Sequence, residues 1–129
     1  MTLIALLIGG NLVHASTKVA EELENLPIVE VSIPIKPITI DEKIDYYGDM
    51  YGVSTYVLHT VIRCESNYNT YALGDSGKSR GLVQIHSGYN PHVSDAEAYD
   101  PDFAINFLAE NLSKGKGRMW TCWRKNFNS

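Results

Sequence analysis

The sequence has few of the residues that build metal and redox sites. Only two of its 129 residues are cysteines, Cys64 and Cys122. Its four histidines show neither the i,i+4 spacing of a helical metal site nor zinc-type spacing with the cysteines; they are His14, His59, His86 and His92. We therefore expect no metal site, and nothing in the sequence implies a cofactor.

An excess of positive charge is also lacking, since the formal net charge is −4. Nucleic acid is disfavoured as a partner, because phosphate binding requires a basic face. The exception is the C-terminal segment 113–129, which carries five basic residues and no acidic one: Lys114, Lys116, Arg118, Arg124 and Lys125. This segment suits either a polyanionic surface, such as a cell envelope, or an ordinary solvated helix end.

No apolar run approaches the 20 or so residues needed to span a bilayer, so we expect no stable membrane span. The apolar run at residues 3–8, followed by a small-residue cleavage site at Val13-His14-Ala15, predicts a signal peptide over residues 1–15. The start lacks the usual Lys or Arg, and an ordinary disordered N-terminus is the alternative. We expect export to the periplasm, the cell envelope or the extracellular space.

Two cysteines in an exported chain favour one disulfide, with two buried thiols as the alternative. Closing a loop of about 59 residues would stabilise the fold by roughly 4 kcal/mol. The bond would hold the C-terminal segment beside Glu65, the neighbour of Cys64.

Residues 16–38 are Glu-rich and then carry Pro27, Pro34 and Pro37, a pattern typical of a linker or an extended arm. Residues 39–129 form one predicted domain, which we expect to be monomeric.

The domain opens with two helix signals. Thr39 and Glu42 have capping-box spacing and predict a helix over 40–52, which Gly52 ends. Ser54 can cap the next helix. In that helix Glu65 continues an apolar stripe with i, i+3, i+4 and i+7 spacing, which places it on the buried face: Leu58, Val61, Ile62 and Glu65.

The remaining segments predict a mainly helical fold with at most a small β-hairpin between Asn67 and Arg80. Residues 66–80 read as loop rather than core, with a tight turn at 74–77 at the tip of the hairpin. Residues 81–86 predict a short helix or a buried turn. Asp100-Pro101 predicts the start of a helix over 101–114, with Gly115 as its stop.

Glu65 is the chief catalytic candidate. A carboxyl group on an apolar stripe near the C-terminus of a helix is desolvated and close to the negative end of the helix dipole, and both effects raise its pKa. A carboxylic acid that keeps its proton near neutral pH can protonate a glycosidic oxygen. The alternative is a glutamate that extends to solvent or pairs with Arg63 or Arg80.

Two motifs carry a family resemblance. Glu65-Ser66-Asn67-Tyr68-Asn69, a polar turn, and Gly81-Leu82-Val83-Gln84-Ile85 resemble the consecutive motifs of the soluble lytic transglycosylase family, in the lysozyme-like superfamily. The resemblance runs from about Ile40 to Leu112. It implies a mainly α, α+β lysozyme-like fold and peptidoglycan glycan strands as substrate.

The resemblance also implies site residues. Glu65 would be the acid and then the base, Ser66 would help to orient it, and Gln84 with the Gly81-Leu82 backbone would line the sugar cleft. The family's later Ala-Tyr-Asn motif has no clear counterpart here. Aromatic residues would therefore come from elsewhere, with core packing as their alternative role; the candidates are Tyr89 and Trp120, and the same question arises for Trp123, Tyr68 and Tyr71.

The predicted reaction is cleavage of the β-1,4 bond between N-acetylmuramic acid and N-acetylglucosamine with a 1,6-anhydro product, for which one carboxyl group suffices. A muramidase that hydrolyses the same bond would need a second carboxylate about 5 to 9.5 Å from the first. Asp75 is the candidate, although aspartate is also common in turns. A noncatalytic glycan-binding envelope module is a further alternative.

Overall fold

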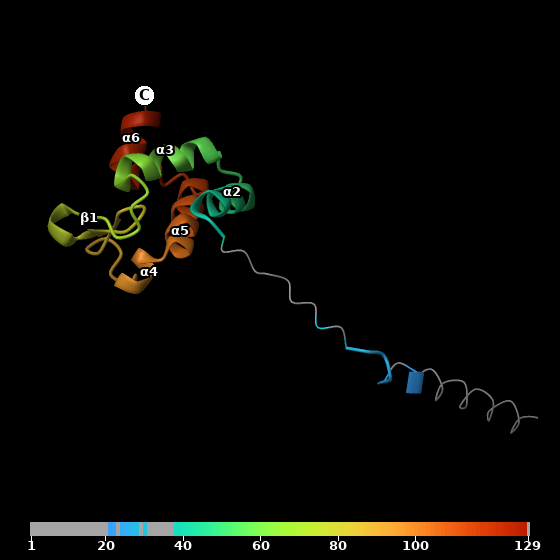
Figure 1. Cartoon of the computed structure of the whole chain (residues 1–129). Helices are drawn as coiled ribbons and strands as arrows, with labels where there is room; N and C mark the ends of the chain where they lie inside the picture. Colours follow the sequence, from blue (N-terminus) through green and yellow to red (C-terminus); the bar gives the residue numbers. More distant parts are fainter. Residues whose placement is uncertain (1–20, 23, 29, 31–37, 129) are drawn as a thin grey trace, which may run out of the picture. The chain divides into compact units, whose positions relative to one another are not determined.

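A computed structural model of the chain describes residues 21–22, 24–28, 30 and 38–128 (Figure 1). The chain forms two units, Met1–Lys36 and Pro37–Ser129. The predicted signal peptide and most of the predicted arm lie outside the described residues. Within the first unit, residues 21, 22 and 24 are helical and Asn25 donates its amide to the Glu21 carbonyl at 2.9 Å.

The first two helices of the second unit begin and end close to where the sequence predicts. Helix α2, Ile40–Tyr51, starts with the reciprocal capping box of Thr39 and Glu42 and ends at Gly52, whose φ of 64° is left-handed. Helix α3 spans Thr55–Ser66. Ser54 occupies its N-cap position, but the predicted side-chain cap is wrong, because its hydroxyl makes no capping hydrogen bond.

The predicted hairpin is present within a slightly larger sheet. Strand β1, Leu73–Gly74, and strand β2, Ser79–Arg80, are antiparallel and flank the short 3-10 helix η1, Asp75–Gly77. A third strand, β3, Ile85–His86, pairs with the other edge of β2. The predicted hairpin is therefore part of a three-stranded sheet. The short helix considered for residues 81–86 is absent, because these residues form a turn and strand β3. The turn predicted there covers 81–84, and the strand that follows satisfies backbone groups of β2 that burial removes from water.

The end of the 66–80 segment also belongs to the buried part of the domain, contrary to the prediction. Ser79 and Arg80 are 4% and 5% exposed. The Arg80 guanidinium is buried because it finds polar partners, donating to the Asp95 carboxylate at 2.5 Å and to the Val93 carbonyl. Pairing offsets the desolvation cost of a buried charge.

The second half of the domain is helical. Helix α5, Pro101–Ser113, begins at the predicted Asp100 cap with proline in its first position. The other elements are α4, Asp95–Tyr99; the 3-10 helix η2, Gly117–Met119; and α6, Thr121–Phe127. The sequence analysis missed α4, although Ser94 and Glu97 form a capping box like that of α2.

Helix α5 lies at the centre of the domain and packs against α2, α3 and α4 (Figure 1). The largest fully buried side chains come from α2, α3, α5 and the 82–85 segment: Ile44, Leu58, Val61, Ile62, Leu82, Val83, Ile85, Ile105 and Leu108. At the edge of this core, Asp102 accepts hydrogen bonds from Lys43 at 2.7 Å and from Tyr47 at 2.9 Å. The domain is mainly α, as predicted, and its small sheet extends the predicted hairpin by one strand.

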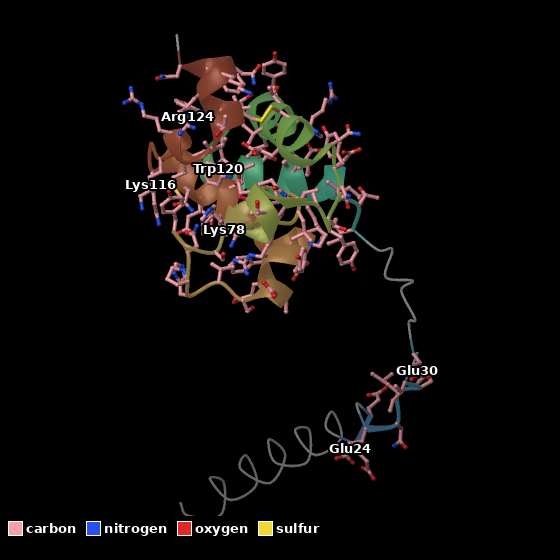
Figure 2. All side chains as sticks on the ribbon, turned by 90° about the vertical axis from the view of Figure 1, so that its left-hand side faces the viewer. Glu24, Glu30, Lys78, Lys116, Trp120 and Arg124 are labelled. Carbon is pink, nitrogen blue, oxygen red and sulfur yellow. A yellow bond between two sulfur atoms is a disulfide. The ribbon has the colours of Figure 1, made fainter. Side chains whose placement is uncertain are left out.

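A disulfide joins Cys64 of α3 to Cys122 of α6, with a Cα–Cα distance of 5.8 Å (Figure 2). This confirms the predicted bond. It ties the C-terminal helix to the end of the helix that carries Glu65. Within the described residues, each helix is too short or too polar to traverse a lipid bilayer.

We expect replacement of both cysteines, Cys64→Ser with Cys122→Ser, to lower the free energy of unfolding by up to about 4 kcal/mol, because the unfolded chain regains the entropy that the cross-link removes. Thermal melting with and without reductant provides the check. The wild type should melt at a lower temperature when reduced, whereas the double variant should be insensitive to reductant. Equal melting temperatures for oxidised and reduced wild type would contradict the expectation.

Candidate active site

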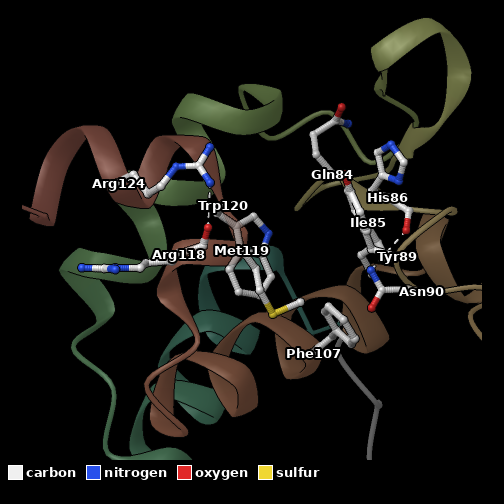
Figure 3. A pocket seen from close by; sticks show the side chains of 10 residues that line it. All are labelled: Gln84, Ile85, His86, Tyr89, Asn90, Phe107, Arg118, Met119, Trp120 and Arg124. Atoms are coloured by element: carbon white, nitrogen blue, oxygen red, sulfur yellow. Dashed lines mark hydrogen bonds between the residues drawn. The ribbon is translucent and has the colours of Figure 1, made fainter.

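A cavity of about 510 Å³ opens beside the C-terminal end of α3. Its lining comes from α3, the sheet and the η2–α6 segment: Glu65, Gly74, Asp75, Ser79, Gln84, His86, Tyr89, Met119, Trp120, Thr121, Cys122, Arg124 and Lys125. A second cavity of about 410 Å³, shown in Figure 3, shares residues with the first: Gln84, His86, Tyr89, Met119, Trp120 and Arg124. We call the two cavities together the cleft.

Glu65 lies in the last turn of α3 and is half-buried at the wall of the cleft. The backbone N–H of Cys122 donates to its Oε1 at 3.1 Å. Because the disulfide joins residues 64 and 122, this donor is held beside the carboxyl group by a covalent link.

The pKa of Glu65 is raised, chiefly because burial disfavours the charged form. The Cys122 N–H opposes this by stabilising the carboxylate, the charge of Asp75 adds to the rise, and the nearby cations Lys125 and Arg124 lower the pKa. The net direction agrees with the expected protonated acid.

The arginines considered as partners of Glu65 are engaged elsewhere among the described residues. Arg80 pairs with Asp95, and the Arg63 guanidinium lies 6.0 Å from the centroid of the Tyr68 ring. The carboxyl group of Glu65 is thus left facing the cleft.

Ser66 holds the cleft wall in place. Its hydroxyl donates to the Leu82 carbonyl at 2.6 Å and to the Ile62 carbonyl at 3.2 Å. The first bond joins the end of α3 to the 81–84 turn. The Ser66 hydroxyl is thus bonded to backbone carbonyls and not to the carboxyl group of Glu65.

Gln84 links the 81–84 turn to the residue that precedes strand β1. Its Nε2 donates to the Gly81 carbonyl at 2.9 Å and to the Ala72 carbonyl at 3.2 Å. Gly81 has a φ of +77°, and a Cβ there would overlap the Ala98 carbonyl oxygen. Only glycine allows both this backbone conformation and this close approach, which explains why the turn that carries Gln84 starts at Gly81.

Asp75 lines the same cavity as Glu65, so the structure brings the two candidate carboxyl groups to one cleft. The Asp75 carboxylate accepts a short hydrogen bond from the Ser79 hydroxyl across the hairpin. Asp75 is therefore both a turn residue and a charge facing the cleft.

The aromatic candidates occupy different positions. Tyr89 is 83% exposed, and its ring lies against that of His86 at a tilt of 36°, with 4.5 Å between centroids. Trp120 is only 4% exposed, and its indole N–H donates to the Val83 carbonyl at 2.8 Å. Trp120 thus belongs to the core although it lines both cavities, whereas Tyr89 lines them as an exposed side chain. Trp123 packs over Gly117.

Sequence reasoning missed several residues of the cleft, among them His86, Met119, Thr121 and Cys122 as a backbone donor. It noticed Arg124 and Lys125 only as part of a basic tail. The expected disulfide could have indicated the residues from 119 to 125, since it brings this segment beside Glu65. Within the described residues, His, Cys, Asp and Glu side chains form no cluster of three that could hold a metal ion.

The mainly helical fold with its small antiparallel sheet is that of a lysozyme-like domain. Residues 42–124 match the family model of the Transglycosylase SLT domain, and the chain belongs to that family. No curated protein and no solved structure matches the chain. The family makes peptidoglycan the substrate class, and the disulfide indicates an oxidising compartment.

The raised pKa of Glu65 predicts how the stability of a Glu65→Gln variant depends on pH. The folded-state pKa lies above the unfolded value, so wild-type stability is lost as pH rises through the folded pKa, while glutamine does not titrate. Relative to the wild type, the variant should therefore gain stability as the pH rises from about pH 4, near the unfolded pKa of glutamate, through the raised folded pKa. Urea unfolding of both proteins across this range is the measurement, and a pH-independent difference would refute the expectation.

Proposed function

We propose that this protein is a peptidoglycan lytic transglycosylase that cleaves the β-1,4 bond between N-acetylmuramic acid and N-acetylglucosamine and forms a 1,6-anhydro product. The observation that carries the proposal is a half-buried Glu65 with a raised pKa at the wall of an open cleft, in a chain of the transglycosylase family. Such a group can lend a proton and take one back in the same catalytic cycle.

In the proposed mechanism, Glu65 first protonates the glycosidic oxygen of the leaving sugar. The acetamido group of the muramic acid residue stabilises the positive charge that develops at C1. The resulting Glu65 carboxylate then accepts the proton of the C6 hydroxyl as that oxygen bonds to C1, which closes the anhydro ring and restores the acid.

The Cys122 N–H supports the second half of this cycle. It is bonded to Oε1 of Glu65, which leaves Oε2 to exchange the proton. The Cys122 N–H stabilises the carboxylate, whereas burial favours the protonated form, so the site supports both forms of the group.

A muramidase is the second candidate function, and the presence of Asp75 in the same cavity as Glu65 favours it. In this case Asp75 would assist attack by water or act as the nucleophile, and the product would carry a reducing end. We prefer the transglycosylase reaction, which needs only one carboxyl group, because the chain belongs to the transglycosylase family.

We further propose that the protein acts outside the cytoplasm as a monomer, with residues 1–15 as its signal peptide and Gln84, Gly81, Leu82, Ser66, Tyr89 and Trp120 shaping the sugar site. The family's substrate lies in the cell envelope, and the disulfide suits an oxidising compartment.

The Glu65→Gln variant should lose cleavage by at least about a hundredfold, because general acid–base catalysis contributes roughly 10²–10⁴-fold and the amide cannot deliver a proton. Mass spectrometry of purified peptidoglycan after incubation with the full chain measures the products. Anhydro-muramyl ends should form with the wild type and with the control Glu110→Gln, whose side chain pairs with Lys114 on α5. A folded and active Glu65→Gln variant would refute the proposed acid.

The Asp75→Asn variant separates the two candidate functions. As a transglycosylase it should still form anhydro products, and the alkaline limb of its pH–rate profile should move to lower pH, because the Asp75 charge helps to raise the pKa of Glu65. Reducing-end products from the wild type, together with loss of activity in Asp75→Asn, would establish the muramidase instead.

A further inference from the structure

Basic side chains gather on the face of the domain that carries the cleft. Figure 2 shows Lys78, Lys116 and Arg124 around the position of Trp120. Arg124 lines both cavities and Lys125 lines the one that contains Glu65. Neither side chain has an acidic partner among the described residues.

Arg124 is held in a defined position. Its Nη1 donates to the Arg118 carbonyl at 2.8 Å and its Nη2 donates to the Thr121 hydroxyl at 2.9 Å. Figure 3 shows its guanidinium across the cleft from Gln84 and His86. Arg118 also lines the smaller cavity, and its guanidinium donates to Asn128 Oδ1 at 3.4 Å. A guanidinium has five N–H donors, so the anchored group retains donors for a ligand.

These cations oppose the chemistry proposed for the cleft. Arg124 and Lys125 lower the pKa of Glu65 and so disfavour its protonated form. They would also repel the positive charge that develops on the sugar at the transition state. Their benefit must therefore lie in binding, where an anionic group on the substrate would neutralise them.

In a peptidoglycan strand the sugar rings are uncharged. Its negative charges are the carboxylates of the short peptide that is attached to each muramic acid residue. We propose that Arg124, assisted by Lys125, forms a subsite for a carboxylate of this stem peptide. The inference rests on the proposed function, because it takes a peptidoglycan strand as the ligand. The planar guanidinium suits a carboxylate, which it can bind through two parallel hydrogen bonds.

The subsite would give the cleft a preference for strands that carry peptide. A bound carboxylate would also offset the two positive charges near Glu65, so the acid would be best protonated when the correct substrate is in place. Strands without peptide would leave the opposing charge uncompensated.

Binding can be measured without cleavage in the full-length Glu65→Gln protein. Calorimetric titration would compare soluble glycan fragments that bear stem peptides with free carboxylates and the same fragments with those carboxylates amidated. We expect the free-carboxylate fragments to bind about tenfold more tightly, since hydrogen bonds between charged groups are strong but this guanidinium is exposed to solvent. Adding Arg124→Gln should abolish the difference, and Arg124→Lys should retain only part of it.

Arg118→Gln is the matched control, because it removes the same charge from a neighbouring residue that lines only the smaller cavity, not the one with Glu65, and leaves the anchoring carbonyl intact. It should keep the preference. Equal affinities for both fragments would overturn the subsite, and so would an equal loss of the preference in Arg118→Gln. Competition for fragment binding by poly(glycerol phosphate), but not by free stem peptides, would also overturn it. If the wild type cleaves no peptidoglycan but Arg124 still sets the binding preference, the proposed function fails and the subsite stands.

Discussion

The Cys64–Cys122 bond holds the last turn of α3 against the first turn of α6, and the geometry of the cleft depends on this junction. Glu65 follows one cysteine directly, and the backbone N–H of the other donates to its carboxyl group. Helix α6 has only seven residues, too few to be stable alone. The cross-link therefore fixes both the catalytic candidate and the helix that forms the opposite wall.

The other wall is held by hydrogen bonds from side chains to backbone carbonyls. Ser66 binds the Leu82 carbonyl, Trp120 binds the Val83 carbonyl, and Gln84 spans the Gly81 and Ala72 carbonyls. Each bond satisfies a polar group that burial removes from water. The motif residues thus act largely as a scaffold for the turn, and Glu65 is the group in the cleft to which we assign proton transfer in the proposed mechanism.

The protonation of Glu65 is a balance of opposing effects. Burial and the negative charge of Asp75 favour the acid, whereas the Cys122 N–H and the cations of α6 favour the carboxylate. A catalyst that must donate and then accept a proton needs both forms to be accessible. Binding of an anion beside Arg124 would move this balance toward the acid. In the proposed subsite, recognition of the stem peptide would thus favour the protonated form of Glu65.

Local signals in the sequence determined α2, α3, α5 and the turn of the hairpin, because capping residues, proline at a helix start and the apolar stripe that contains Glu65 act over a few residues. The sequence also indicated the disulfide and the family through two short motifs. Only the tertiary structure decided that β3 completes the sheet, that Arg80 is buried with Asp95, and that Trp120 belongs to the core. It also placed Arg124 and Lys125 beside Glu65. The burial of Trp120 and the approach of α6 to Glu65 depend on contacts between residues far apart in the chain. At β3 and Arg80 the contacts are closer in sequence, but burial and charge pairing outweigh local preference there as well.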